Sequence, residues 1–201
     1  MGHKFAEIGF TPAVKALQVL HGSREGYASF EEGDDYNGQL STREAQFISE
    51  RDSFYVASVS ETGWPYVQHR GGPAGFVKIL DATRIGFADY SGNRQYMSTR
   101  NLSKDNRVSL FFMDYPNRRR LKMFGRVELV GLEQEDILAQ LEDSSYPAMV
   151  ERGVVITIEG FDWNCPAHIT PRYTEADIAT MNPGAGEITV TEPVATAVVD
   201  E

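Results

Sequence analysis

The feature that most constrains the fold is a series of short, β-rich stretches between residues 53 and 161, several of them joined by tight turns. The segments SFYVASVS and WPYVQHRGG flank the turn ETG, and FVKILD and RIGFADY flank ATR. The segments RVSLFFMDY, RLKMFGRVELVG and GVVITIEGF follow. Short strands at hairpin spacing are typical of antiparallel barrels rather than of alternating strand–helix units. We therefore expect a mainly β fold of the α+β class, an antiparallel barrel of about six or seven strands with small flanking helices.

Helical patterns surround these strands. In FTPAVKALQVLHGSREG, Thr11 is a suitable N-cap and Pro12 a suitable first residue. The apolar residues expected on the buried side of this helix are Val14, Leu17, Val19 and Leu20. The stretch STREAQFISERD offers a capping box made by Ser41 and Glu44. Further helices are expected at residues 93–103 and in LEQEDILAQLED.

The 201 residues suit one domain, which we place at 1–182 with N-terminal helices over about 1–50. Residues 183–201 are acidic and lack aromatics, and we expect a C-terminal tail or an arm that docks on a partner. The net charge of −10 disfavours nucleic acid and anionic membranes as partners. The single cysteine, Cys165, cannot form an internal disulfide. Since no leader or membrane-spanning run is recognised either, a cytoplasmic location is expected.

The segment GNRQ, residues 92–95, stands between a predicted strand and a predicted helix. The N–H groups at a helix start attract phosphate, and Gly92 lets the backbone turn towards it. Arg94 adds a charged fork that suits phosphate oxygens, while Asn93 and Gln95 add neutral donors. The alternative is a solvated helix start with Arg94 paired to a carboxylate, and position alone slightly favours it.

The strand WPYVQHRGG carries polar residues within a barrel pattern. Alternation places Tyr66, Gln68 and Arg70 on one face and His69 on the other. Polar groups inside a barrel need partners, which a ring system with carbonyl groups and ring nitrogens plus a ribityl chain would supply. Gly71 allows close approach of the backbone. The alternative is an edge strand with a wet polar face, in which His69 has only a structural role.

Two later segments hold further candidates. Charge runs such as NRRRLKMFGR are usually solvated, but Arg120 at the strand start can also reach an anion. In FDWNCPAHITPRY, Trp163 and Arg172 combine a flat aromatic with a cation, which would suit a flat anionic ligand. The alternative is a packed C-terminal loop. Cys165 and His168 lack a second pair of metal ligands, so no metal site is predicted.

Four stretches, in the order FISERDSFYVASVSETGWPYVQHRGG, GFADYSGNRQ, NRVSLFFMDY and RRLKMFGRVELV, resemble the pyridoxamine 5'-phosphate oxidase-like flavoproteins. They are most similar to a bacterial subgroup described as pyridoxamine 5'-phosphate oxidase-related and FMN-binding. The resemblance covers roughly residues 8–175. It implies a split β-barrel of the FMN-binding type and a homodimer with two FMN sites at its interface. The FMN-binding residues implied are Gln68, His69, Arg70, Gly71, Asp89, Asn93, Arg94, Gln95, Arg120, Trp163 and Arg172.

The chain also departs from the oxidases. Gln95 stands where they have a lysine for the FMN phosphate, and Arg120 falls near a glutamine that contacts their flavin. Where they grip the substrate phosphate, this chain has the acidic stretch LEQEDILAQLEDSSYPAM, and PRYT stands near their Arg-x-His. A phosphorylated pyridoxamine is therefore disfavoured. The resemblance implies an FMN-dependent oxidoreductase with a small-molecule substrate or electron donor and no assigned catalytic residue. Alternatives are a flavin or haem carrier without turnover, or a deazaflavin-dependent reductase.

Overall fold

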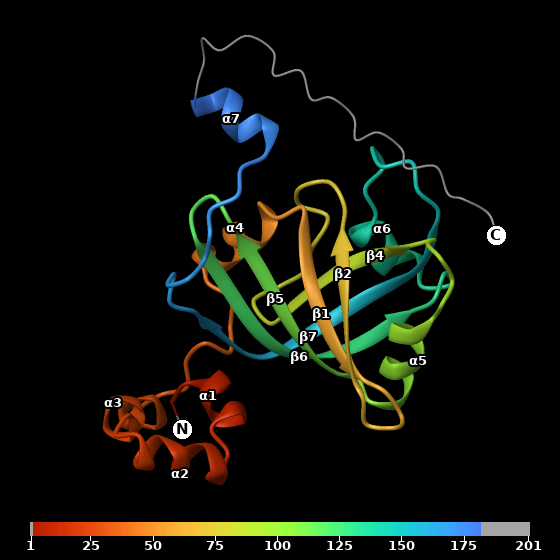
Figure 1. The fold of residues 1–201 in the computed structure, drawn as a ribbon. Helices are drawn as coiled ribbons and strands as arrows, with labels where there is room; N and C mark the ends of the chain where they lie inside the picture. Colours follow the sequence, from red (N-terminus) through yellow and green to blue (C-terminus); the bar gives the residue numbers. More distant parts are fainter. Residues whose placement is uncertain (1, 182–201) are drawn as a thin grey trace, which may run out of the picture.

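A computed structural model describes residues 2–181, so the tail predicted at 183–201 lies outside the described residues. Seven strands form one antiparallel sheet in the order β2-β1-β5-β6-β7-β4-β3 (Figure 1). The strands are β1 (Ser53–Val59), β2 (Pro65–Gly71), β3 (Lys78–Ile79), β4 (Arg84–Tyr90), β5 (Arg107–Asp114), β6 (Arg119–Val130) and β7 (Val150–Trp163). The predicted strands and hairpins are thus confirmed.

The sheet curls without closing, which confirms the predicted split barrel. Strands β2 and β3 stand at its two edges. The curl nevertheless brings β2 opposite β4, because the Nη1 of Arg70 in β2 lies 2.9 Å from the Oδ1 of Asp89 in β4. β2 and β4 are not neighbours in the sheet, so they are not joined by backbone hydrogen bonds. The ion pair therefore spans the opening between them. The opening is where the candidate site lies.

Helices flank the sheet. They are α1 (Lys4–Gly9), α2 (Pro12–Leu20), α3 (Arg24–Ala28), the 3-10 helix η1 (Ser29–Glu31), α4 (Thr42–Ser49), α5 (Met97–Lys104), α6 (Glu135–Leu141) and α7 (Glu175–Met181). The predicted caps are confirmed: the Thr11 hydroxyl accepts from the N–H of Val14, and Ser41 and Glu44 form the capping box. None of the helices of residues 2–181 is long and apolar enough to cross a lipid bilayer.

The helix predicted at 93–103 is displaced. It begins only at Met97, four residues later than expected. Arg94 and Tyr96 have positive φ angles of 57° and 53°, which lie outside the right-handed helical region. The residues predicted to open the helix therefore form a loop in front of it.

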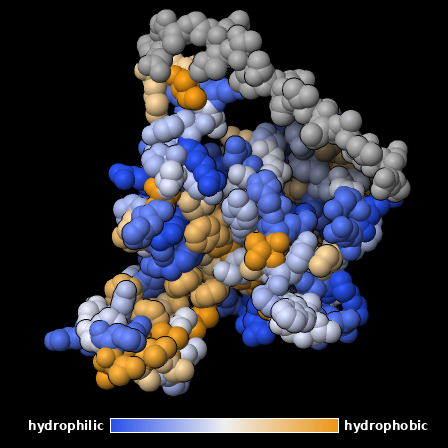
Figure 2. Space-filling view, viewed as in Figure 1, coloured by the Kyte–Doolittle hydropathy of each residue, from blue (hydrophilic) through white to orange (hydrophobic). Residues whose placement is uncertain are grey.

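The buried side predicted for α2 is wrong. Leu17, Val19 and Leu20 are 56%, 66% and 74% exposed, whereas Gln18 is buried. Figure 2 shows hydrophobic surface gathered over these N-terminal helices, at the lower left of the view. Gln18 is held inward by a hydrogen bond that its side chain accepts from Arg24, which lies beyond the end of the helix.

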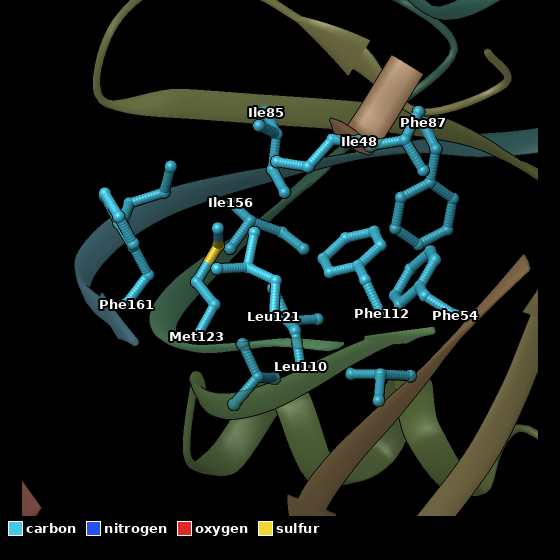
Figure 3. Close-up of a cluster of buried hydrophobic side chains, with 14 of the residues drawn as sticks. Ile48, Phe54, Ile85, Phe87, Leu110, Phe112, Leu121, Met123, Ile156 and Phe161 are labelled. Atoms are coloured by element: carbon cyan, nitrogen blue, oxygen red, sulfur yellow. The ribbon is translucent and has the colours of Figure 1, made fainter. Parts of the chain in front are cut away.

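Aromatic and aliphatic side chains fill the barrel (Figure 3). The ring of Phe54 in β1 stacks on Phe112 in β5 with centroids 5.0 Å apart. It also meets the edge of Phe87 in β4 at 5.4 Å. Since β1 and β4 do not pair as strands, this contact holds the two sides of the open sheet together. Burial of such rings supplies much of the stability of a small barrel.

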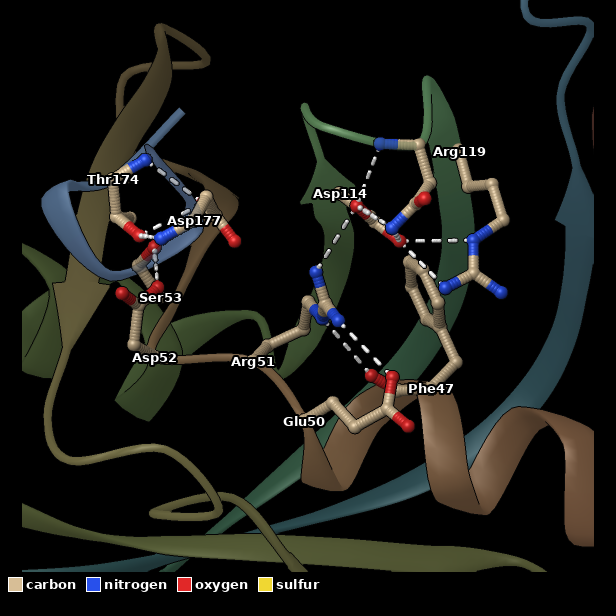
Figure 4. A network of polar contacts seen from close by, with 10 residues as sticks. Phe47, Glu50, Arg51, Asp52, Ser53, Asp114, Arg119, Thr174 and Asp177 are labelled. Carbon is tan, nitrogen blue, oxygen red and sulfur yellow. Dashed lines mark hydrogen bonds and ion pairs between the residues drawn. The ribbon is translucent and has the colours of Figure 1, made fainter. Parts of the chain in front are cut away.

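A polar network ties α4 to the β5–β6 hairpin (Figure 4). Asp114, at the end of β5, is only 1% exposed. Its carboxylate accepts hydrogen bonds from Arg119 (2.6 Å to Nη2) and from the backbone and side chain of Asn117. Burial opposes ionisation, but these donors and the charge of Arg51 hold the pKa of Asp114 below its usual value. Asp114 is therefore a charged anchor of the hairpin.

Candidate functional site

A cleft of about 260 Å³ opens where the two sides of the sheet face each other. Its walls come from β2, the end of β4, the loop before α5, the first turn of α5 and the start of β7. Six of the predicted cofactor residues line it: Gln68, Arg70, Asp89, Asn93, Arg94 and Gln95. The cleft therefore joins three segments that are distant in the sequence, residues 66–70, 89–99 and 151–152.

An ion cluster forms one wall of the cleft. Asp89 lies between two arginines, with Oδ1 at 2.9 Å from Nη1 of Arg70 and Oδ2 at 3.4 Å from Nε of Arg152. Arg152 also donates to Glu151 (2.6 Å). Burial raises the pKa of Asp89, although both arginines oppose the shift. The hydrogen bond from Arg152 lowers the pKa of Glu151.

The cluster retains unused donors. Within the described residues, the buried Nε atoms of Arg70 and Arg152 make no hydrogen bond, although the Nε of Arg152 lies 3.4 Å from the carboxylate of Asp89. Buried donors are almost always paired in proteins. An anionic or carbonyl-bearing ligand in the cleft would accept hydrogen bonds from those N–H groups of Arg70 and Arg152 that Asp89 and Glu151 do not occupy. This donor set suits a phosphate or a ring carbonyl, so the residues present fit a flavin nucleotide.

The first turn of α5 forms a second wall. Tyr96 is its N-cap residue and makes no capping hydrogen bond through its side chain. The leading N–H groups of a helix have no partner within the helix and carry a partial positive charge. Arg94 and Arg152 line the cleft beside this turn, and the Arg152 guanidinium lies 5.7 Å from the ring of Tyr96. The candidate anion seat is therefore the start of α5 at Met97, four residues after the helix start predicted at residue 93.

Hydrogen bonds fix the polar groups at the base of the cleft. The hydroxyl of Ser98 in α5 donates to the Oε1 of Gln68 in β2. With its carbonyl occupied in this way, the Gln68 side chain keeps its NH₂ group as a donor. Beneath it, Asn101 donates to the hydroxyl of Ser58 in β1 (3.1 Å). These two bonds lock α5 against the β1–β2 hairpin.

The comparison with known families decides the classification. The family model described as pyridoxamine 5'-phosphate oxidase matches residues 40–159, which is more than half of the chain. The chain belongs to the pyridoxamine 5'-phosphate oxidase family. No curated protein matches it.

Three solved structures illustrate what this chain is similar to. A candidate pyridoxamine 5'-phosphate oxidase from Lactobacillus delbrueckii is 18% identical, with a TM-score of 0.48, and the match covers 62% of this chain and 94% of that one. An FMN-binding protein from Syntrophomonas wolfei is 12% identical, with a TM-score of 0.42 and coverage of 73% and 97%. An F420 reductase is 20% identical, with a TM-score of 0.43 and coverage of 57% and 93%.

The remaining predicted residues of this family member lie outside the cleft. His69 points to the opposite, outer face of β2, where its ring meets Tyr55 edge-on at 5.5 Å. On the same outer face, Tyr115 lies near Tyr55, and the Arg172 guanidinium lies 4.8 Å from the Tyr115 ring. Gly71 ends β2 beside His69. Within one chain, His69 and Arg172 therefore lie on the far side of β1 and β2 from the cleft.

Arg120 lies near the start of β6 and Trp163 at the end of β7, and neither lines the cleft. Arg120 alternates with the core residue Leu121 and so points outward, and its buried Nε has no hydrogen-bond partner in residues 2–181. The indole N–H of Trp163 donates to Oε1 of Glu44 (2.7 Å), and the Arg43 guanidinium lies 4.3 Å from its ring. In one chain Trp163 thus contacts α4, and a cofactor contact for either residue stays a prediction.

Four further residues of the cleft do not follow from the sequence pattern: Tyr96, Ser98, Glu151 and Arg152. The sequence signal for two of them was the charged pair Glu151 and Arg152, which precedes GVVITIEGF and belongs to β7. Arg152 lies opposite Asp89 in the β4–β7 register. That pairing joins residues 63 positions apart, and local pattern does not specify it.

Proposed function

We propose that this family member binds FMN in the cleft and acts as an FMN-dependent oxidoreductase. The observation that carries the proposal is the meeting of Gln68 and Arg70 with the segment 93–98 in one cleft. The resemblance to the family predicts that both segments contact the same cofactor. The unpaired donors of the ion cluster and the anion seat at α5 supply the polar groups that a phosphorylated flavin requires.

The phosphate and the ring system of FMN would each meet residues of suitable chemistry in the cleft. The start of α5 with Arg94 and Arg152 would hold the phosphate, while Gln68 and Arg70 would donate to the polar edge of the ring system. When bound, FMN supplies the electron or hydride transfer. The residues of the chain bind and orient it, and the packed barrel behind the ion cluster excludes water from one side.

A second copy of the chain completes the proposed site. The cleft of about 260 Å³ is smaller than the about 300–1,000 Å³ usual for such ligands, so part of the flavin would protrude. The outer face of β1 and β2 carries His69 and Arg172, which cannot reach the cleft of their own chain. In a homodimer these residues and Arg120 would cover the flavin of the partner.

The substrate proposed is a small molecule without a phosphate of its own. The loop after α6 borders the cleft, because the carbonyl of Met149 accepts from the N–H of Ser91 and the Tyr146 ring meets Tyr90 at 5.0 Å. This region carries Asp143 and Glu142 and no arginine. A second phosphate arriving here would meet negative charge.

The visible absorption spectrum of the purified protein tests the proposal. We expect the native protein to show flavin absorbance that bleaches on anaerobic addition of NADH or NADPH. Denaturation of a separate sample should release FMN. A colourless protein that also fails to bind added FMN would contradict the proposal. Flavin that no donor reduces would indicate a carrier. A larger rise in melting temperature with a deazaflavin or haem than with FMN would identify the cofactor as that ligand.

A further inference from the structure

Glu151 enters the cleft through a bulge in β7. Asp89 of β4 pairs with Arg152, but the next residue of β4, Tyr90, pairs with Val150, so Glu151 is the extra residue of β7 at this point. Neighbouring residues of a regular strand point to opposite faces of the sheet. Here the side chains of Glu151 and Arg152 both line the cleft. A bulge can re-aim a side chain in this way, and this one adds a second carboxylate to the cleft beside Asp89.

Glu151 lies among the groups proposed to bind phosphate. Its Oε2 accepts a hydrogen bond of 2.6 Å from Nη2 of Arg152, and the two side chains are only 19% and 20% exposed. The pKa of Glu151 lies below its usual value chiefly because of this bond, with further lowering by Ser91 and by the charge of Arg94. Glu151 is therefore negatively charged at neutral pH and is within electrostatic reach of both arginines.

The charges of the cleft leave a phosphate monoester under-compensated. Three arginines line it, Arg70, Arg94 and Arg152, together with the carboxylates of Asp89 and Glu151. With both carboxylates ionised, one positive charge is in excess, whereas a phosphate monoester carries about 1.5 to 2 negative charges at pH 7. A phosphate on Arg94 and Arg152 would therefore meet a carboxylate that is already bonded to Arg152.

A supporting role for Glu151 in placing Arg152 is the alternative, and the geometry does not require it. Arg152 already faces Asp89 in the register of β4 with β7, and its Nε lies 3.4 Å from the Oδ2 of Asp89. Its guanidinium also lies 5.7 Å from the ring of Tyr96. These contacts place Arg152 without Glu151. The carboxylate therefore contributes mainly its charge.

We infer that Glu151 is a specificity-determining residue that competes with the phosphate of the ligand for Arg152 and Arg94. It sets how strongly the cleft prefers a phosphorylated flavin to the same ring system without phosphate. The inference deepens the proposed function and rests on it, because the start of α5 with Arg94 and Arg152 is the proposed phosphate site.

Titration of the flavin-free wild type and of Glu151→Gln with FMN and with riboflavin tests the inference. Glutamine keeps the size of the side chain and can still accept from Arg152, but it removes the charge. We expect FMN to bind the variant more tightly, by on the order of fivefold, because a like charge beside the phosphate is lost. Riboflavin should change by less than about twofold, and added salt should reduce the gain for FMN.

Glu159→Gln is the matched control. Glu159 also belongs to β7 and bonds an arginine, Arg126 at 2.7 Å, but it does not line the cleft. We expect this variant to bind both ligands as the wild type does. Circular dichroism should show all three proteins folded, and Glu151→Ala provides the same test if Glu151→Gln does not fold.

Three results would overturn the inference: an FMN affinity that is unchanged or lower in Glu151→Gln, an equal gain for riboflavin, or the same gain in Glu159→Gln. Thermal unfolding with inorganic phosphate separates the inference from the proposed function, since it needs no flavin. A protein that binds no flavin, but that phosphate stabilises more in Glu151→Gln than in the wild type, contradicts the proposed function alone. A flavoprotein whose preference for FMN is indifferent to Glu151 contradicts this inference alone.

Discussion

Replacement of Arg94 by glutamine should weaken the binding of FMN far more than that of riboflavin. The side chain lines the cleft beside the start of α5, where the phosphate is expected, and riboflavin lacks that phosphate. A hydrogen bond to a charged group contributes about 1.5–3 kcal/mol, which corresponds to a loss of about tenfold to a hundredfold in affinity. Arg94 is exposed, so the substitution should leave the stability of the fold nearly unchanged.

Titration of the flavin-free protein with each ligand, followed by flavin fluorescence, measures both dissociation constants. Arg100→Gln is the matched control. Arg100 belongs to α5 itself but pairs with Glu61 at 3.2 Å and does not line the cleft. We expect Arg100→Gln to change neither affinity by more than about twofold, since exposed ion pairs contribute little. Raised salt should narrow the difference between the two ligands in the wild type.

Equal losses for FMN and riboflavin would refute this placement of the phosphate. They would show that Arg94 acts on the shape of the loop, whose backbone is left-handed at Arg94 and Tyr96. An unchanged FMN affinity would also refute it, and would leave the start of α5 and Arg152 as the proposed phosphate contacts.

The core, the hairpin anchor and the N-terminal segment give three further predictions. Phe54→Ala removes a ring that joins β1 to β4 and should lower the free energy of unfolding by about 3–5 kcal/mol in urea denaturation. Gly160→Ala places a Cβ 2.6 Å from the backbone nitrogen of Phe5, so α1 should become more accessible to protease. Asp114→Asn should cost about 1–3 kcal/mol. Because the folded pKa of Asp114 is lowered, its contribution is present above the unfolded pKa of about 3.9 and is lost as pH falls through the folded value. The urea midpoint should therefore depend less on pH below about pH 4 in Asp114→Asn than in the wild type.

Much of the barrel and part of the cleft can be read from local sequence. Alternation correctly places Gln68 and Arg70 on one face of β2 and His69 on the other, because the two-residue period of a strand needs no knowledge of its partners. The caps at Thr11 and Ser41 are equally local.

The features that local sequence does not show depend on contacts between distant residues or on backbone strain. Arg152 enters the cleft through the register of β4 with β7, which tertiary packing selects. The orientation of α2 depends on Arg24 and Glu31, which lie beyond the helix and reverse the outcome expected from hydropathy alone. The late start of α5 reflects the positive φ angle of Tyr96, a conformation that residues of this type seldom adopt.

The position of the phosphorus atom in a crystal structure of the protein with FMN tests the central claim most directly. We expect the phosphate beside Arg94, Arg152 and the first N–H groups of α5, with the ring system along Gln68 and Arg70. A flavin bound elsewhere on the chain, or a phosphate remote from the start of α5, would contradict this account of the cleft.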